Sequence, residues 1–568
     1  MRLFPMISGQ GRALLAQAGV ALAIAILIAG CGDNYRPPVT TVPTNGPAAQ
    51  PSAYAIVVSS TGTNTATLTN PQCYSNDGIV TIIDYSGDSI MTEACIGPGP
   101  TAFTLDAVAA TGYTVNSDKT LSNFAITTSL QTKQVSFSTL SPTAQIVNLM
   151  PLTSGLWATD LNGDVADLFS GSPQAFKLAI PVASSGAATM PVFMAGSSSN
   201  TGQREYVLSQ NVPDSPAAIQ TEAVTCNNRA NFASVAAGVV TPIEISNNTA
   251  DPVIPVGKCP VFAVQTPDQQ RLFVLNRGDD TITVINSNKN VLDQCPAPLT
   301  GTPPACPPPY NTNQDGQPIT FHPVLPLSTA ALTTANAPPN CKIAVDPTCG
   351  MGSVAGPIYA EYNTATQQLV VANYDGGSIS VIDVSLDRYG NDSATFGTTY
   401  TIPVGNTATP NPASVTVLYD GSKAYTANQN DGAQNGTVTA VNLTTYTVEK
   451  TIPVAGHPRT VVNTQNSEYA KIYVDSPDSP YITIIQSSPT VTDLVDTAVL
   501  VEGLPIDVRT TTQNGASGAG AGGNNNYSSR VPGYGQPCNL SAGQLASFYG
   551  PSYLSTLTLA ECQKQSLP

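Results

Sequence analysis

A strand–turn–strand pattern recurs along the chain and restricts the fold more than any other feature. Each copy has an apolar strand, a turn of Asn, Asp or Gly, and a second strand with alternating β-branched residues, which is typical of a β-hairpin. The clearest copies are RLFVLNRGDDTITVIN (271–286), QLVVANYDGGSISVID (368–383), KAYTANQNDGAQNGTVTAVN (423–442) and KIYVDSPDSPYITIIQ (471–486).

A second element separates these hairpins. It reads VIPVGKCP at 253–260, TIPVGNTATP at 401–410, TIPVAGHP at 451–458 and LVEGLP at 500–505, and the last three copies begin about fifty residues apart. Self-similarity with this period and about four strands per unit indicates radial repetition of small sheets. The sequence therefore predicts an all-β protein, a β-propeller of four-stranded blades with loop insertions.

These residues resemble the YVTN β-propeller repeat, which is carried by YncE-like and surface-layer-associated proteins. The resemblance is good for 250–510 and weaker for 54–250, and lactonase-like seven-bladed propellers are structural relatives of the family. Hairpins counted along this chain begin near 54, 109, 156, 205, 271, 368, 423 and 471. The count suggests eight blades and the family seven, so both numbers remain open.

The two ends of the repeat region are expected to complete one blade together. The chain enters at Tyr54 on a hairpin strand that has no innermost strand before it, and it leaves through LPIDVRTT (504–511), which reads as an innermost strand with no hairpin after it. Joining the two would remove open sheet edges, which otherwise invite aggregation.

The first 53 residues predict a targeting signal followed by a tether. Arg2 and Arg12 precede an apolar run that ends in Ile28-Ala29-Gly30-Cys31, and this arrangement resembles a bacterial lipoprotein signal. The resemblance implies cleavage of residues 1–30, lipidation of Cys31, and an outer-membrane destination in the periplasm or at the cell surface. The Pro- and Thr-rich residues 31–53 would be an extended tether.

Composition excludes one class of partner and suggests a compartment. Only 10% of the residues are charged and the formal net charge is −16, so nucleic acid is not an expected partner. Ten cysteines remain after Cys31, an even number that favours disulfides in an exported chain. Their spacing suggests neighbouring pairs, although it does not prove the connectivity: Cys73–Cys95, Cys226–Cys259, Cys295–Cys306, Cys341–Cys349 and Cys538–Cys562.

Insertions and a tail extend the repeat region. The propeller is assigned to 54–512, with insertions at 212–239 and 287–357 whose prolines and cysteines would stiffen a binding surface. Residues 513–537 form a Gly- and Asn-rich linker, and residues 538–568 a small C-terminal appendage.

Several short motifs are better explained by the fold than by chemistry. Arg277-Gly278-Asp279 matches an adhesion tripeptide but occupies a hairpin turn. Asp160 to Asp164 begins like a calcium loop, yet Val165 and Gly171 stand where Gly and Glu are needed. The pattern Gly518-x-Gly520-x-x-Gly523 lies in the linker, with no strand before it.

The histidines and cysteines do not indicate a metal site or a hydrolase triad. No cysteine pair has C-x-x-C spacing, no G-x-S-x-G motif occurs, and His322 and His457 are the only histidines. His457 lies in a turn between repeats and is expected to be structural, whereas His322 lies in an insertion and is less constrained. We therefore expect no metal and no cofactor.

The function expected from the sequence is that of a non-catalytic binding or scaffold protein of the cell envelope. Its partners would be the membrane, through a lipid at Cys31, and an envelope protein or glycan. Two alternatives remain: a metal-dependent lactonase-like hydrolase that uses the central channel, which rests on the fold resemblance alone, and a structural component that associates with itself.

Overall fold

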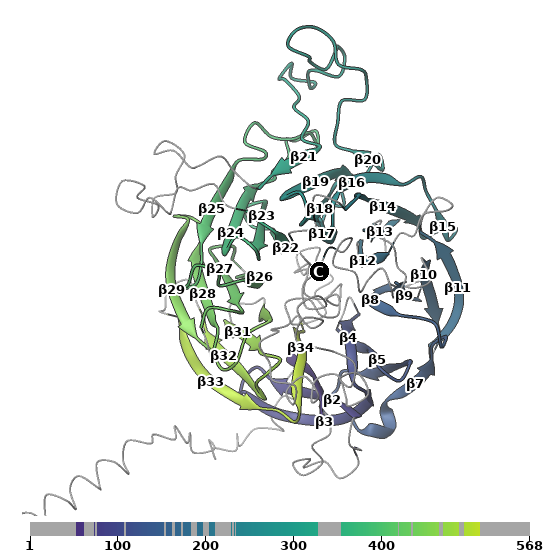
Figure 1. The fold of residues 1–568 in the computed structure, drawn as a ribbon, viewed down its shortest axis with the longest axis vertical. Helices are drawn as coiled ribbons and strands as arrows, with labels where there is room; N and C mark the ends of the chain where they lie inside the picture. Colours follow the sequence, from purple (N-terminus) through teal and green to yellow (C-terminus); the bar gives the residue numbers. More distant parts are fainter. Residues whose placement is uncertain are drawn as a thin grey trace, which may run out of the picture. The chain divides into compact units, whose positions relative to one another are not determined.

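The computed structural model describes residues 53–511, and within them the strands form eight antiparallel sheets. The sheets follow one another around a ring (Figure 1), so the protein is an eight-bladed β-propeller, and the choice between seven and eight blades is settled. Gaps in the description fall at 62–72, 74–76, 107–108, 153–154, 162–164, 172–173, 183–189, 197–203, 211–225, 227–228, 230–231, 233–234, 328–353, 419, 433–434, 465–469 and 488–492.

Each blade runs from an inner strand to an outer strand. From the centre outward, blade 1 contains β34 (Leu504–Thr510), β1 (Tyr54–Ser60), β2 (Asp77–Asp84) and β3 (Ser89–Pro98). Blade 2 contains β4 (Pro100–Leu105), β5 (Thr111–Asn116), β6 (Thr120–Ala125) and β7 (Ser136–Thr139), with the short 3-10 helix η2 (Thr132–Gln134) before β7. Blade 3 contains β8 (Ile146–Leu152), β9 (Gly155–Asp160), β10 (Val165–Ser170) and β11 (Ala175–Pro181), and blade 4 contains β12 (Pro191–Gly196), β13 (Arg204–Ser209) and β14 (Ala237–Glu244), with β15 (Thr249–Ala250) and β16 (Ile254–Lys258).

The remaining blades repeat this order with the clearest sequence copies. Blade 5 contains β17 (Pro260–Gln265), β18 (Arg271–Asn276) and β19 (Thr281–Asn286), with β20 (Val291–Leu292) and β21 (Val324–Pro326). Blade 6 contains β22 (Pro357–Asn363), β23 (Gln368–Asn373), β24 (Ser378–Asp383) and β25 (Thr399–Pro403). Blade 7 contains β26 (Pro412–Val417), β27 (Lys423–Asn428), β28 (Thr437–Asn442) and β29 (Thr447–Pro453), and blade 8 contains β30 (Thr460–Asn463), β31 (Lys471–Asp475), β32 (Tyr481–Gln486) and β33 (Leu494–Leu500).

Burial decreases from the centre of the ring to its rim. Inner and second strands such as β26 and β18 are buried at every position, whereas the outer strand β29 is largely exposed. Both faces of a blade pack against neighbouring blades, so its inner strands need apolar residues on both sides rather than an alternating pattern. The inner strands contact one another in sequence around the ring, from β34 through β4, β8 and β12 to β30 and back to β34.

A buried asparagine explains part of the repeated motif. Asn276, the last residue of β18, donates from its side-chain amide to the hydroxyls of Thr281 and Thr283 at 3.2 and 2.8 Å. The same contacts are made by Asn116, Asn373 and Asn428 in three other blades. A buried amide needs hydrogen-bond partners, so the Asn of the second strand and the hydroxyl residues of the third strand recur together.

The two ends of the repeat region close the ring as expected. β1 pairs with β34 in an antiparallel ladder from Ala55–Thr510 to Ser60–Leu504. Just beyond the ladder, the amide of Tyr54 donates to the Thr511 hydroxyl at 2.6 Å and the Thr511 amide donates to the Tyr54 carbonyl at 2.8 Å. The first blade is therefore completed by the last described strand. No helix in the described part of the chain has the length and apolarity to span a bilayer.

Candidate functional site

A pocket of about 130 Å³ lies where an insertion from blade 5 meets a loop of blade 6. Its walls come from Gln270 and Arg271 before and at the start of β18, from the 286–293 segment after β19, from residues 319–321, and from residues 389–392 between β24 and β25. These segments are far apart in the sequence, and only the packing of two adjacent blades brings them together.

The insertion that forms one wall is held in place at several points. We call residues 293–323, between β20 and β21, the arm; it projects outward from the ring in Figure 1. Cys295 and Cys306 form a disulfide in it, with their Cα atoms 5.7 Å apart. In its second half, the Asn313 amide donates to Asp387 at 3.1 Å and Asp315 forms an ion pair with Arg388. Both partners belong to the blade 6 loop, so the arm is fastened to its neighbouring blade.

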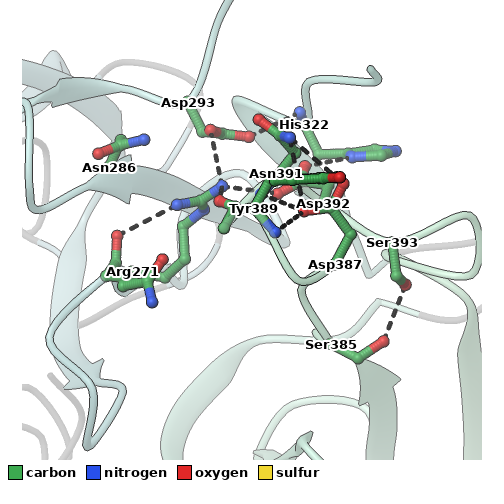
Figure 2. Close-up of polar contacts among 12 residues, drawn as sticks. Arg271, Asn286, Asp293, His322, Ser385, Asp387, Tyr389, Asn391, Asp392 and Ser393 are labelled. Carbon is green, nitrogen blue, oxygen red and sulfur yellow. Dashed lines mark hydrogen bonds and ion pairs between the residues drawn. The ribbon is translucent and has the colours of Figure 1, made fainter. Parts of the chain in front are cut away.

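The floor of the pocket is a buried charge cluster. The Nη2 atom of Arg271 lies 3.0 Å from an oxygen of Asp392 and 3.4 Å from an oxygen of Asp293, and it also donates to the Gly390 carbonyl at 3.2 Å. The three charged side chains are at most 3% exposed. Figure 2 shows Arg271 between the two aspartates. Buried charges of this kind persist only when they are paired and hydrogen-bonded.

The two aspartates share this cation, and the ionisation of Asp293 is perturbed by its surroundings. Burial, followed by the negative charge of Asp392 and a hydrogen bond between the two carboxyl groups, raises the pKa of Asp293 to about 6, although the charge of Arg271 and the amide of His322 act in the opposite direction. Asp293 is therefore mostly ionised near neutral pH, and it takes up a proton at mildly acidic pH.

His322 connects the arm to this cluster. Its Nδ1 lies 2.7 Å from Asp392 Oδ2, its backbone amide donates to Asp293 at 3.1 Å, and its ring stacks on Phe396 with the centroids 5.0 Å apart. The side chain is 30% exposed. The sequence marked His322 only as a histidine in an insertion; its partner Asp392 has no motif around it and was missed.

The cluster has one unsatisfied donor, and its rim is polar. The Nε atom of Arg271 is buried and has no hydrogen-bond partner among the described residues. Around the opening stand side-chain amides, the Lys289 ammonium group and the Tyr389 ring and hydroxyl. The described residues contain no group of three or more His, Cys, Asp or Glu side chains able to hold a metal. The arrangement is suited to hydrogen bonding with a small ligand.

The Arg277-Gly278-Asp279 tripeptide occupies the turn between β18 and β19, as predicted. The Arg277 side chain is 1% exposed and forms a two-point ion pair with Asp375 at 2.7 and 3.0 Å. Its guanidinium group lies 5.6 Å from the ring centres of Phe232 and Tyr374. Asp279 accepts a hydrogen bond from the Lys258 amide at 2.5 Å. A buried and paired arginine is not available as an adhesion ligand.

Three of the disulfides suggested by spacing are present in the structure: Cys73–Cys95, Cys226–Cys259 and Cys295–Cys306. Cys226–Cys259 joins the 212–239 insertion, which includes the first residues of β14, to the start of β17. Cys341, Cys349, Cys538 and Cys562 lie outside the described residues, as do Cys31 and Gly518 to Gly523.

The other singled-out residues have structural partners. His457, in the connection between β29 and β30, has its Nδ1 2.5 Å from Asp478 Oδ2 and its amide 2.7 Å from Asp478 Oδ1. Asp160 accepts the Gln145 amide at 2.8 Å, while residues 162–164 of the calcium-like stretch lie outside the described residues.

Comparison with known proteins supports the fold and does not identify a family. The sequence matches no protein-family model and no curated protein. Among solved structures, the chain is similar to the dihydro-heme d1 dehydrogenase NirN (11% identity, 82% of this chain and 76% of that chain, TM-score 0.51), to AztD from Citrobacter koseri (10%, 82% and 99%, 0.47) and to the periplasmic gluconolactonase PpgL from Pseudomonas aeruginosa (14%, 82% and 100%, 0.39).

These similarities concern the architecture alone, because identities of 10–14% do not carry function. The chain is thus a β-propeller, a fold that it shares with proteins of several different activities. The structure defines that fold as eight blades of antiparallel strands.

Proposed function

We propose that the protein is a non-catalytic binding protein of the bacterial cell envelope and that the arm is its recognition element. The observation that carries this proposal is the fastening of the arm: a disulfide within it and a buried charge cluster at its base hold an insertion that lies outside the ring. Pre-ordering a loop in this way removes the entropy cost of ordering it on binding.

The surface of the arm also suits contact with a partner. Leu299 and Tyr310 are 58% and 44% exposed, and Tyr is enriched in protein interfaces because its ring is apolar and its hydroxyl can hydrogen-bond. Three disulfides support an extracytoplasmic location. Within this proposal, Cys31 carries the lipid that holds the propeller at the outer membrane.

The alternatives have weaker support. A lactonase-like hydrolase is supported by the fold resemblance alone. Self-association is compatible with the apolar side chains on outer strands, such as Phe176 and Leu500, but these are scattered over different blades and do not form a defined interface.

A sedimentation experiment tests the proposal. Mature chain without the lipid is mixed with peptidoglycan sacculi and with outer-membrane vesicles from a Gram-negative host. We expect the wild type to sediment with one of the two fractions and the double variant Leu299→Ser, Tyr310→Ser to bind at least tenfold more weakly. The control Val448→Ser changes an exposed residue on β29 and is expected to bind as the wild type does.

If the arm variant binds as strongly as the wild type, the arm is not the recognition element. Turnover of a lactone or ester by the purified chain after addition of Ca²⁺, Mg²⁺, Mn²⁺ or Zn²⁺ would instead support the hydrolase and overturn the non-catalytic assignment.

A further inference from the structure

We infer that the pocket at the base of the arm binds one neutral, polyhydroxylated ring: an uncharged monosaccharide unit of an envelope glycan. This inference rests on the proposed binding function and names the chemistry of one ligand. The carrying observations are the pocket between the arm and the blade 6 loop and the composition of its lining.

The balance of charge argues against an ionic ligand. Two cationic side chains, Arg271 and Lys289, and two acidic ones, Asp293 and Asp392, line the pocket. Arg271 is already neutralised by the aspartates, so a phosphate or carboxylate would meet two buried carboxyl groups. A cation would meet the guanidinium group and the ammonium group. Neither type of ion gains from this site.

The mixture of hydrogen-bonding groups matches hydroxyl groups. The side-chain amides of Gln270, Asn286 and Asn391 carry both donor and acceptor atoms. Asn286 Oδ1 also accepts the Lys289 amide, and Asn391 Nδ2 also donates to Asp387. A sugar hydroxyl also donates and accepts, so it can satisfy both kinds of group.

The size of the pocket and its aromatic residues narrow the ligand class. A volume of about 130 Å³ is small for a ligand site, which favours a single ring over a disaccharide. Tyr389 and Phe321 contribute aromatic rings to the lining. Such rings can pack against the C–H face of a sugar, while the small apolar share of the lining makes a lipid chain a poor fit.

The acidic pair is arranged for binding and not for glycoside hydrolysis. Retaining glycosidases place two carboxyl groups about 5–5.5 Å apart and inverting enzymes place them farther apart, on either side of the scissile bond. Asp293 and Asp392 both form ion pairs with Arg271, and their side chains are almost fully buried. They therefore position Arg271 and His322, and they cannot flank a glycosidic bond.

Saturation-transfer NMR and calorimetry on the full mature chain at pH 7.5 test this inference. The neutral probes are glucose, galactose, rhamnose and N-acetylglucosamine, and the charged probes are glucuronate, glucosamine and inorganic phosphate. We expect at least one neutral sugar to bind with a millimolar Kd and every charged probe to bind at least tenfold more weakly. Tyr389→Ala should weaken the sugar at least fivefold, while Tyr481→Ala, an exposed tyrosine on blade 8, should not.

Melting curves for each variant establish that it is folded. The inference is overturned if no neutral sugar binds at 100 mM, if a charged probe binds more tightly, or if Tyr389→Ala binds as the wild type does. If one of these results is obtained while sedimentation with the envelope still depends on Leu299 and Tyr310, only the sugar-binding inference is wrong and the proposed binding function stands. If neither sugar binding nor arm-dependent sedimentation is observed, the proposed binding function is contradicted as well.

Discussion

Arg271 and Arg277 lie at the two ends of β18, and each pairs with an aspartate of the next blade. Arg271 meets Asp392 and Arg277 meets Asp375. Both guanidinium groups are almost fully buried, so each ion pair has lost most of its hydration and depends on its partner. The two pairs fix the register of blade 5 against blade 6 at both ends of the strand.

Removing one of these arginines should leave an aspartate partly buried and less well neutralised. We expect Arg277→Ala to lower the free energy of unfolding by about 3–5 kcal/mol, the usual cost of breaking a buried pair. Urea denaturation followed by tryptophan fluorescence measures it. Lys289→Ala, an exposed cation on the same blade, should change stability by less than about 0.5 kcal/mol. Similar losses in the two variants would contradict the assignment.

Glu205 is a buried carboxyl group with no hydrogen-bond partner among the described residues. Both carboxylate oxygens are buried without a hydrogen bond among the described residues, and burial raises the pKa of Glu205 well above its ordinary value. The side chain occupies the space beside Gly196, where a Cβ atom would lie 2.1 Å from a carboxylate oxygen. The fold therefore binds the Glu205 proton more tightly than the unfolded chain does.

The sign of the resulting pH dependence follows from that shift. Stability is unaffected below the unfolded pKa near 4.5 and falls as the pH rises above it, because the unfolded state ionises first. Glu205→Gln should match the wild type at pH 4 and exceed it by on the order of 1–3 kcal/mol at pH 8. Glu244→Gln, which alters a carboxylate paired with Arg204, should show no such gain. Parallel stability curves for wild type and Glu205→Gln would show that Glu205 is not the source.

At the scale of elements, the arm is a rigid attachment rather than part of the core. Its disulfide and its contacts with residues 387–392 hold it, while the apolar core lies in the blades. Its local stability should therefore be separable from the stability of the ring.

Replacing Cys295 and Cys306 by serine should loosen the arm without melting the propeller. We expect the melting temperature to change by less than about 2 °C, since the arm opens without exposing core residues. Chymotrypsin should cleave after Leu299 or Tyr310 at least tenfold faster in the double variant. The matched variant Cys73→Ser, Cys95→Ser should leave this cleavage rate unchanged, and equal rates in all three proteins would mean that the Cys295–Cys306 disulfide does not order the arm.

Local features of the sequence predicted the hairpins and the disulfides, but they did not predict the pocket. A hairpin is encoded within one strand–turn–strand stretch, and the disulfides present join cysteines that are neighbours in the sequence, so both were predictable. Arg271 and Asp392 are separated by 121 positions, and no periodic signal relates them. Only the packing of blade 5 against blade 6 makes them partners. No acidic residue near His322 in the sequence indicates its partner, so the sequence alone could not assign His322 a role.

At the scale of the whole molecule, stability depends on closing the ring. β34 is almost fully buried and supplies the inner strand of blade 1. It also contacts the inner strands of the blades on both sides, β30 and β4. Without it, β1 would present an open edge and two neighbouring blades would lose a packing surface.

Two truncations separate this effect from any contribution of the C-terminal residues. A chain ending at Thr511 keeps β34 and should melt within about 3 °C of the full chain. A chain ending at Val501 lacks β34 and should be insoluble or unfold without cooperativity. Circular dichroism with thermal melting measures both. A cooperative transition in the shorter chain, near that of the longer one, would show that the ring is stable while open.

The closure also determines how the propeller would respond to mechanical force. Tyr54 and Thr511 lie side by side at the same end of the β1–β34 ladder. A load that pulled these two positions apart would break the ladder one hydrogen bond at a time, starting at Tyr54, instead of shearing all of its bonds together. Stretched between its ends, the ring would open at blade 1 under small forces. The same ring would resist a load that enters at Tyr54 and leaves through the arm, because that path crosses packed blades.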